Sequence, residues 1–172
     1  MSDLIRLVYA SQSINDQIRG SIDPVVGGIL AQSRRNNSRS QISGVLYYGD
    51  GFFFQCLEGE KSVVEETYAR IRSDKRHRHA RIIRLQGISE RLFSDWSMKY
   101  VPAEKEVRQF LRQEGIDLFN PFRFEEAVID RLLLFFHRSE EPEALAEKPA
   151  GSSGRGGFWK RLTGTLGLRE SA

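Results

Sequence analysis

The chain has 172 residues, a net charge of +3 and 40% hydrophobic residues, which suits one globular domain with additional segments. Its single cysteine, Cys56, excludes an internal disulfide framework and a cysteine-based metal site, and no apolar run approaches the ~20 residues of a membrane span. Neither a secretory signal nor a recognised nucleic-acid-binding motif is visible, so we expect a cytoplasmic protein that does not bind nucleic acid.

The N-terminal part of the chain predicts a strand, a helix and a hairpin. Loose alternation of apolar residues predicts the strand over residues 4–10. An Asp-Pro pair, typical of an N-cap followed by proline at the first helical position, opens a helix over residues 23–35. Residues 42–48 and 52–58 then predict two strands joined by a Gly-Asp-Gly turn.

The next elements complete a recognisable order. A capping-box motif, Ser62-Val63-Val64-Glu65, and apolar residues at helical spacing predict a second helix that begins at residue 62 and includes Asp74. Two further strands follow over residues 80–87 and 96–102. Strand, helix, hairpin, helix and strand is the order of a ferredoxin-like α+β layer. We therefore expect a five-stranded mixed sheet with two helices on one face.

Beyond residue 102 the pattern becomes helical, with helices predicted over residues 104–114 and 124–138, packed beyond the last strand. Residues 132–136 of the helix over 124–138 are apolar on every side, so we expect the sheet and another surface to cover this helix. Residues 139–157 are rich in Glu, Pro, Gly and Ser, which predicts disorder. Residues 158–169 are apolar and basic, and either contact a partner or a membrane as a small amphipathic helix or belong to a disordered tail.

Gln55 is unusual because it lies in the apolar run of residues 52–57. Alternation places its side chain on the same face as Phe53 and Leu57. A primary amide there costs roughly 1–3 kcal/mol unless polar groups meet it. Because the amide carries a donor and an acceptor that can exchange by rotation or tautomerisation, Gln55 is a candidate for a switch.

Polar residues on the two predicted helices converge near this strand. Ile29, Ser33 and Asn37 follow one another at steps of four along the first helix, beside Asn36. The corresponding residues of the second helix are Arg70, Ile71 and Asp74, of which the first and last lie four apart. Together they describe a slot with two isoleucine walls and one polar edge, which suits a flat heteroaromatic ring.

Three further residues lie within reach of this slot. Tyr9, on the first strand, could face the ring beside Gln55, and Trp96 and Met98 lie two apart on the last strand and hence on one face. Taken singly, each residue of the slot also fits an ordinary role in core packing, helix capping or a surface ion pair. His79 and His137 have no clear metal partner, so no metal site is expected.

The joint pattern is more specific than any single residue. Its motifs are Leu7-Val8-Tyr9-Ala10-Ser11, Ser33-Arg34-Arg35-Asn36-Asn37, Ile42-Ser43-Gly44-Val45-Leu46-Tyr47-Tyr48, Gly51-Phe52-Phe53-Phe54-Gln55-Cys56-Leu57-Glu58-Gly59, Arg76-His77 and Trp96-Ser97-Met98. In order and spacing they resemble the BLUF domain, a blue-light sensor that uses FAD. The resemblance covers roughly residues 3–102.

The resemblance implies the cofactor and the role of each site residue. Non-covalent FAD is implied, with FMN or riboflavin as substitutes. Tyr9 matches the photoactive tyrosine and Gln55 the switching glutamine, with Ser33, Trp96 and Met98 as the other photoactive positions. The positions implied to bind the cofactor are Ile29, Asn36, Asn37, Gln55, Arg70, Ile71, Asp74 and His77.

The resemblance also implies a mechanism. Light drives proton-coupled electron transfer from Tyr9 to the flavin, the Gln55 amide reorganises, and the oxidised flavin returns with a slightly red-shifted spectrum. The signal is expected to pass through the last strand and the C-terminal helices to a protein partner of unknown identity. We expect residues 1–102 to be the sensor, residues 103–138 an output or homo-oligomerisation extension, and residues 139–172 a tail.

No enzymatic output is expected, because the remaining ~70 residues are too few for a separate enzyme domain. Two other classes of function stay open. A flavin-dependent oxidoreductase would need a substrate face, and no dinucleotide motif of the GxGxxG type occurs. The other class is a flavin-free ferredoxin-like module, either an interaction protein or an acylphosphatase-like hydrolase.

Overall fold

The computed structural model describes residues 3–14 and 24–146, and within them a five-stranded sheet has the order β4-β1-β3-β2-β5. The strands are β1 (Leu4–Ser13), β2 (Ser43–Gly49), β3 (Phe52–Glu60), β4 (His77–Gly87) and β5 (Lys99–Tyr100). β5 pairs in parallel with β2, whereas the other neighbouring strands pair antiparallel. The sheet is therefore mixed, as predicted.

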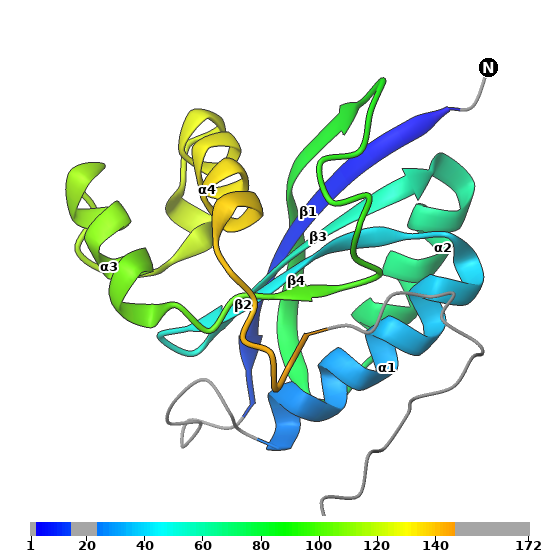
Figure 1. Ribbon diagram of the computed structural model, residues 1–172, viewed down its shortest axis with the longest axis horizontal. Helices are drawn as coiled ribbons and strands as arrows, with labels where there is room; N and C mark the ends of the chain where they lie inside the picture. The colour runs from blue at the N-terminus through cyan, green and yellow to red at the C-terminus, as the bar shows by residue number, and fades with distance from the viewer. Residues whose placement is uncertain (1–2, 15–23, 147–172) are drawn as a thin grey trace, which may run out of the picture.

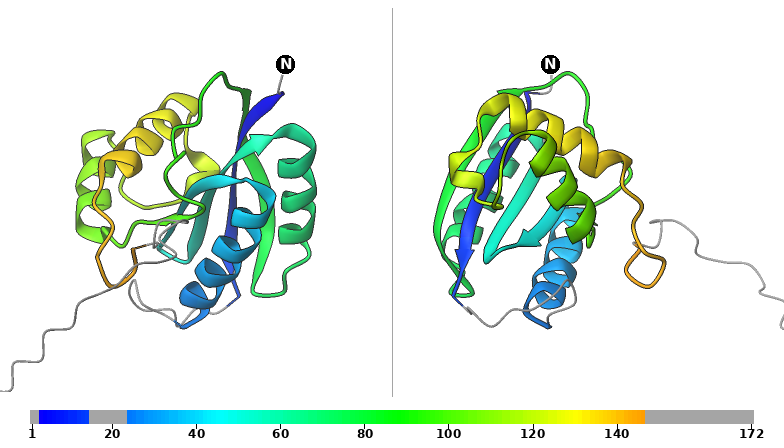
Figure 2. Two further views of the ribbon diagram at one scale, coloured as in Figure 1. Left: turned by 45° about the vertical axis from the view of Figure 1, so that its right-hand side comes forward. Right: turned by 90° about the vertical axis from the view of Figure 1, so that its left-hand side faces the viewer.

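Helices cover both faces of this sheet (Figure 1). One layer contains α1 (Pro24–Ser40) and α2 (Lys61–Arg72). The other contains α3 (Glu104–Gln113), the 3-10 helix η1 (Pro121–Arg123) and α4 (Glu126–Arg138). The sheet stays between the two layers when the molecule is turned (Figure 2). The ferredoxin-like α+β class is confirmed, and the C-terminal helices cover the face opposite α1 and α2.

Alternation of the strand side chains divides the core into two clusters, one on each face of the sheet. Leu7, Tyr9 and Leu57 pack on the side of α1 and α2, whereas Val8 and Cys56 pack on the side of α3 and α4. Because both faces are covered, β2 is buried along its whole length. It therefore lacks the alternation of apolar and polar residues that is typical of a strand with one exposed face. Burial also raises the pKa of the Cys56 thiol well above its ordinary value.

The predicted capping box of Ser62 and Glu65 is wrong, because α2 begins at Lys61 and Glu60 is its N-cap. The carboxylate of Glu60 accepts hydrogen bonds from the backbone N–H groups of Ser62 and Val63, at 3.2 and 3.3 Å. These N–H groups have no partner within the helix itself, so the cap satisfies them. The strand β3 therefore leads directly into α2.

α4 is covered on two sides, as its apolar sequence predicts. Phe136 stacks on Tyr47 of β2, with 5.2 Å between the ring centroids. Phe135 lies against Phe110 of α3, with 5.4 Å between the centroids. α3 is therefore the second surface that covers this helix.

The chain after α4 departs from the disorder predicted from residue 139 onwards. Residues 139–146 run from the end of α4 down to α1 (Figures 1 and 2), where Arg34 contacts Glu141 and Leu145. The predicted disorder of the rest of the tail, and the segment 158–169, lie outside the described residues. Among the residues that the structure describes, no helix has the length and apolar character needed to cross a membrane.

Candidate functional site

A cavity of about 140 Å³ lies between α1 and α2, over the central strands of the sheet. Every residue predicted to bind the cofactor lines it, namely Ile29, Asn36, Asn37, Gln55, Arg70, Ile71, Asp74 and His77. The other lining residues are Tyr9, Ser11, Gln32, Ser33, Leu46, Phe53, Thr67 and Arg76. The slot that helical spacing predicts is thus present.

The floor of the cavity is built by Tyr9 of β1 and Gln55 of β3, which lie opposite each other in the antiparallel pair. Tyr9 Oη donates a hydrogen bond to Gln55 Oε1. Gln55 Nε2 donates to Met98 Sδ at 3.4 Å. Since Gln55 is only 1% exposed, these contacts offset the cost of burying its amide.

Tyr9 is held as a neutral hydrogen-bond donor. Burial is the main reason why the pKa of its hydroxyl lies well above the ordinary value, and the nearby Tyr68 and Asp74 raise it further. The Tyr68 ring lies 5.3 Å from the Tyr9 ring, centroid to centroid, and packs beside it from α2. The hydroxyl therefore keeps its proton, and because Gln55 Oε1 can only accept, Tyr9 is the donor in this bond.

α1 brings Ile29, Ser33 and Asn37 to the cavity, as their steps of four predict. Asn37 also has a structural contact, because its Nδ2 donates to the carbonyl oxygen of Ser97 at 3.0 Å. This side chain is 2% exposed. Asn37 therefore both lines the cavity and joins α1 to the chain that leads into β5.

The prediction that Arg70 and Asp74 lie on one helix is wrong. α2 ends at Arg72, and Asp74 lies beyond its C-cap residue, Ser73. Arg70 Nη2 donates to Thr67 Oγ1 within α2 at 3.1 Å. Both predicted residues still line the cavity, but Asp74 reaches it from the turn after the helix.

Asp74 pairs with Arg76, which donates to it from its backbone N–H and its Nε, each at 2.9 Å. The side-chain bond from Arg76 is the main cause that lowers the pKa of Asp74 below its ordinary value. Arg76 also donates to Gln32 Oε1 on α1. The pair thus spans the cavity between the two helices.

Two of these residues were not predicted to belong to the site. Arg76 occurs in the motif Arg76-His77, but no role was predicted for it. Gln32 was not predicted either, although it lies one helical turn from Ile29.

Two buried polar atoms at the cavity, Ser11 Oγ and His77 Nδ1, have no hydrogen-bond partner among the described residues. The other ring nitrogen of His77, Nε2, lies 2.9 Å from the carbonyl oxygen of Ile71 and donates to it. Burial is the main cause that lowers the pKa of His77, so the ring is neutral and Nδ1 offers a lone pair. Ser11 was also missed, although alternation places it on the face of Tyr9.

The prediction that Trp96 and Met98 share a face is wrong. Strand pairing begins only at Lys99, so strand alternation does not apply to the residues before it. Met98 is fully buried in the cluster on the cavity side. Trp96 packs on the opposite side of the sheet, with its ring 6.5 Å from that of Phe93. Met98, not Trp96, is therefore the neighbour of Gln55.

Comparison with known families agrees with this arrangement. A family model described as "BLUF: Sensors of blue-light using FAD" matches residues 4–99, more than half of the chain. The chain belongs to the BLUF family. As a member of this family it is a blue-light sensor, and its cofactor is FAD.

Solved BLUF structures have the same fold. BlsA in its photo-activated state is 35% identical, with a TM-score of 0.75, and the alignment covers 81% of this chain and 99% of that one. BlrB, "a BLUF protein", in its dark state is 33% identical, with a TM-score of 0.58 and coverage of 80% and 95%. The similarity therefore extends beyond the family match into the helices α3 and α4.

Curated relatives are longer proteins. The photoactivated adenylate cyclase subunit beta of Euglena gracilis is 32% identical over 96 residues, which are 55% of this chain and 11% of that protein. The blue light- and temperature-regulated antirepressor BluF of Escherichia coli K12 is 27% identical over 153 residues, 87% of this chain and 37% of that protein. The chain thus spans a small part of the relatives it matches.

The residues of the cavity fit the flavin part of FAD. Ile29 and Ile71 supply apolar walls from two different helices, as stacking on a flat ring requires. Ser11 Oγ and His77 Nδ1 are buried at the cavity and find no partner within residues 3–14 and 24–146, so a ligand with polar atoms would satisfy them. An apolar slot with a few polar groups of this kind is typical of a cofactor site.

Proposed function

We propose that Tyr9 and Gln55 are the light-responsive pair of this BLUF photoreceptor. The observation that supports this assignment is the hydrogen bond from Tyr9 Oη to Gln55 Oε1 in the floor of the cavity. The two side chains are 3% and 1% exposed, so water does not compete for their protons. A small change in this bond is therefore felt strongly at the ring above it.

The proposed binding residues are those that line the cavity between α1 and α2. Ile29 and Ile71 hold the ring between them, and the side-chain amides of Asn36 and Asn37 meet its polar edge. Bound FAD supplies the absorption of blue light and, once excited, an acceptor for an electron from a neighbouring tyrosine. FMN and riboflavin share the ring and are proposed as weaker substitutes.

The protein's part in the photochemistry is to move a proton between Tyr9 and Gln55 and to rearrange the hydrogen bonds of the Gln55 amide. Tyr9 Oη releases its proton towards Gln55 Oε1, the atom that already accepts its hydrogen bond. The Gln55 amide then exchanges its donor and acceptor ends, by rotation or tautomerisation. Met98 Sδ, which accepts from Gln55 Nε2, consequently faces a different group. Return of the electron and proton to Tyr9 leaves only this changed hydrogen bonding, which shifts the spectrum slightly to the red.

The proposed output is a protein–protein contact made by the C-terminal part. A few hydrogen bonds bias a two-state equilibrium by about 1–3 kcal/mol, which suffices to change binding of a partner. In this proposal residues 1–102 are the sensor and residues 103–138 the output or homo-oligomerisation extension, with no enzymatic activity. The E. coli relative is named an antirepressor, a role that protein contact would serve.

A light-minus-dark absorption spectrum tests the proposed function. The purified protein with FAD is expected to be yellow, and blue light is expected to shift its absorption reversibly to the red without bleaching. Bleaching by NADH, together with no shift, would instead favour a flavin-dependent oxidoreductase. A colourless protein that takes up no FAD would favour the flavin-free module.

His77 predicts a dependence of stability on pH. Its pKa in the folded protein lies below the ordinary value near 6.5, so as pH falls through about 6.5 the unfolded chain takes up a proton that the folded chain does not. The melting temperature is therefore expected to fall between about pH 7 and pH 5. In His77→Gln, the part of this fall that His77 causes should disappear. An equally steep profile in the variant would contradict the assignment to His77.

A further inference from the structure

Three consecutive residues around β5 are fixed to other parts of the protein. The carbonyl oxygen of Met98 accepts from Arg34 Nε of α1 at 3.0 Å. Lys99 Nζ donates to the carbonyl oxygen of His137, in the last turn of α4, at 2.8 Å. The backbone N–H of Tyr100 donates to Glu141 Oε1 at 2.9 Å. The short strand is thus tied to α1, to α4 and to the segment after α4.

Arg34 joins three acceptors with one guanidinium. Besides Met98 O, it donates from Nη1 to the carbonyl oxygen of Leu145 at 2.7 Å and from Nη2 to Glu141 Oε1 at 2.5 Å. The side chains of Arg34 and Glu141 are only 19% and 6% exposed. Because the pair is largely removed from water, loss of one partner costs more than it would at the surface. A planar fork with several N–H donors is the group that can hold these acceptors together.

A single residue, Met98, connects this guanidinium to Gln55. Met98 contacts Gln55 Nε2 through its sulfur and Arg34 through its carbonyl oxygen. Met98 is fully buried, so a change in what meets its side chain is passed to its backbone rather than absorbed by free space. Leu145 packs against the core cluster that contains Met98. A continuous set of contacts therefore runs from Gln55 to residues 141–145.

We propose that Arg34 is a positioning residue that couples the Gln55 site to the segment 139–146. In this inference, which rests on the proposed function, the segment and Arg34 hold Met98 in the arrangement that meets Gln55 Nε2 before illumination. Coupling between two sites is reciprocal. Reorganisation of Gln55 therefore loosens the segment, and loss of the segment's contacts in turn destabilises the starting arrangement of Gln55. In this proposal the barrier to recovery already resembles that starting arrangement, so the return of Gln55 to it becomes slower.

The test compares Arg34→Gln and Glu141→Gln with the wild type, all loaded with FAD. Both variants are expected to recover from the red-shifted state about fivefold more slowly or slower still, as a coupling of about 1 kcal/mol gives. Glu141→Gln removes the charge of the partner and leaves α1 unchanged. It therefore tests the coupling even if Arg34→Gln folds poorly. Arg34→Lys keeps the charge but loses the planar fork, so it should restore the recovery rate only in part.

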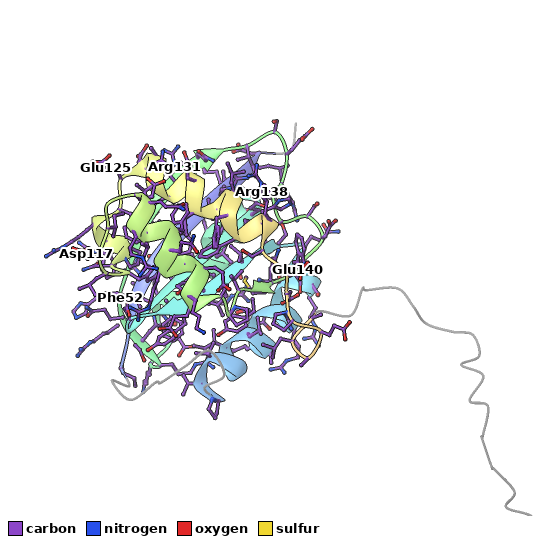
Figure 3. All side chains as sticks on the ribbon, turned by 60° about the vertical axis from the view of Figure 1, so that its left-hand side comes forward. Phe52, Asp117, Glu125, Arg131, Arg138 and Glu140 are labelled. Atoms are coloured by element: carbon purple, nitrogen blue, oxygen red, sulfur yellow. The ribbon has the colours of Figure 1, made fainter. Side chains whose placement is uncertain are left out.

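Arg131→Gln is the matched control. Arg131 also pairs with a glutamate, Glu114, but it lies on α4, at the opposite end of the view in Figure 3 from α1, the helix that carries Arg34. This variant should recover at the wild-type rate. If Arg34→Gln and Glu141→Gln also recover at that rate, the coupling is overturned, even where their folding is weakened.

Hydrogen exchange gives a second readout that does not depend on the spectrum. In the wild type, light is expected to raise exchange of the Tyr100 amide and of residues 139–146. In both variants exchange should already be high in the dark and change little with light. High dark exchange with a normal recovery rate would show a purely structural tether and would overturn the positioning role. Low dark exchange in the variants would show that Arg34 and Glu141 do not hold the segment 139–146. A wild type without any red shift would instead refute the proposed function.

Discussion

Gln55→Leu is expected to bind FAD and remain yellow, yet to lose the reversible red shift completely. Leucine has a similar volume and fills the same place among apolar neighbours, but it offers no group to Tyr9 Oη or to Met98 Sδ. The Tyr9 hydroxyl then loses its acceptor, and no amide remains that can exchange donor and acceptor. A light-minus-dark spectrum of the purified variant measures the effect.

Tyr9→Phe is expected to abolish the red shift as well, because it removes the hydroxyl proton and the readily oxidised phenol at the other end of the hydrogen bond.

Two matched variants serve as controls for these substitutions. Gln109→Leu changes an exposed glutamine on α3, and Tyr47→Phe removes a buried hydroxyl on the opposite face of the sheet. Both should keep the full shift. A normal shift in Gln55→Leu or Tyr9→Phe would remove that residue from the mechanism.

Much of the site could be predicted because its residues lie on regular elements. Alternation along β3 placed Gln55 with Phe53 and Leu57, and steps of four along α1 placed Ile29 and Asn37 on one face. Within a strand or helix, spacing in the sequence fixes direction in space. The positions of the two isoleucine walls and of Gln55 follow from that rule, whereas the role of Gln55 does not.

Other parts could not be predicted because the regular element ends before the residue in question. Trp96 precedes the first paired residue of β5, so alternation gave the wrong face. Asp74 follows the C-cap of α2, so a step of four from Arg70 wrongly placed it on the helix. The end of an element depends on caps and on pairing with distant strands, and such signals are weak in a single sequence.

The contacts of Arg34 were invisible for another reason. Its partners Met98, Glu141 and Leu145 lie 64 or more positions away in the sequence. No periodic pattern links them to α1, and the composition of residues 139–157 indicated disorder. Tertiary contacts overrode that local tendency for residues 139–146, because the buried Glu141 carboxylate pairs with the partly buried guanidinium of Arg34.

Glu58→Ala is expected to cause the largest loss of stability, about 3–5 kcal/mol in the free energy of unfolding. The Glu58 carboxylate is fully buried and accepts from Arg6 Nε at 2.6 Å. It also accepts from the backbone N–H groups of Leu92 and Phe93 at 3.1 and 2.8 Å. Truncation leaves a guanidinium and two N–H groups without their acceptor in a site that the protein closes to water. Urea denaturation measures the loss.

Glu60→Ala, on the same strand, is the control, because Glu60 is exposed and caps α2. It should destabilise clearly less, and an equal loss would contradict the weight given to burial at Glu58. The loop that Glu58 holds leads from β4 to Met98 and so ends at the Gln55 site. Glu58→Ala should therefore alter the dark recovery rate even under conditions in which the protein stays folded. A changed recovery rate would mean that the Glu58 carboxylate, on the face of the sheet away from the cavity, sets the position of Met98 on the cavity side.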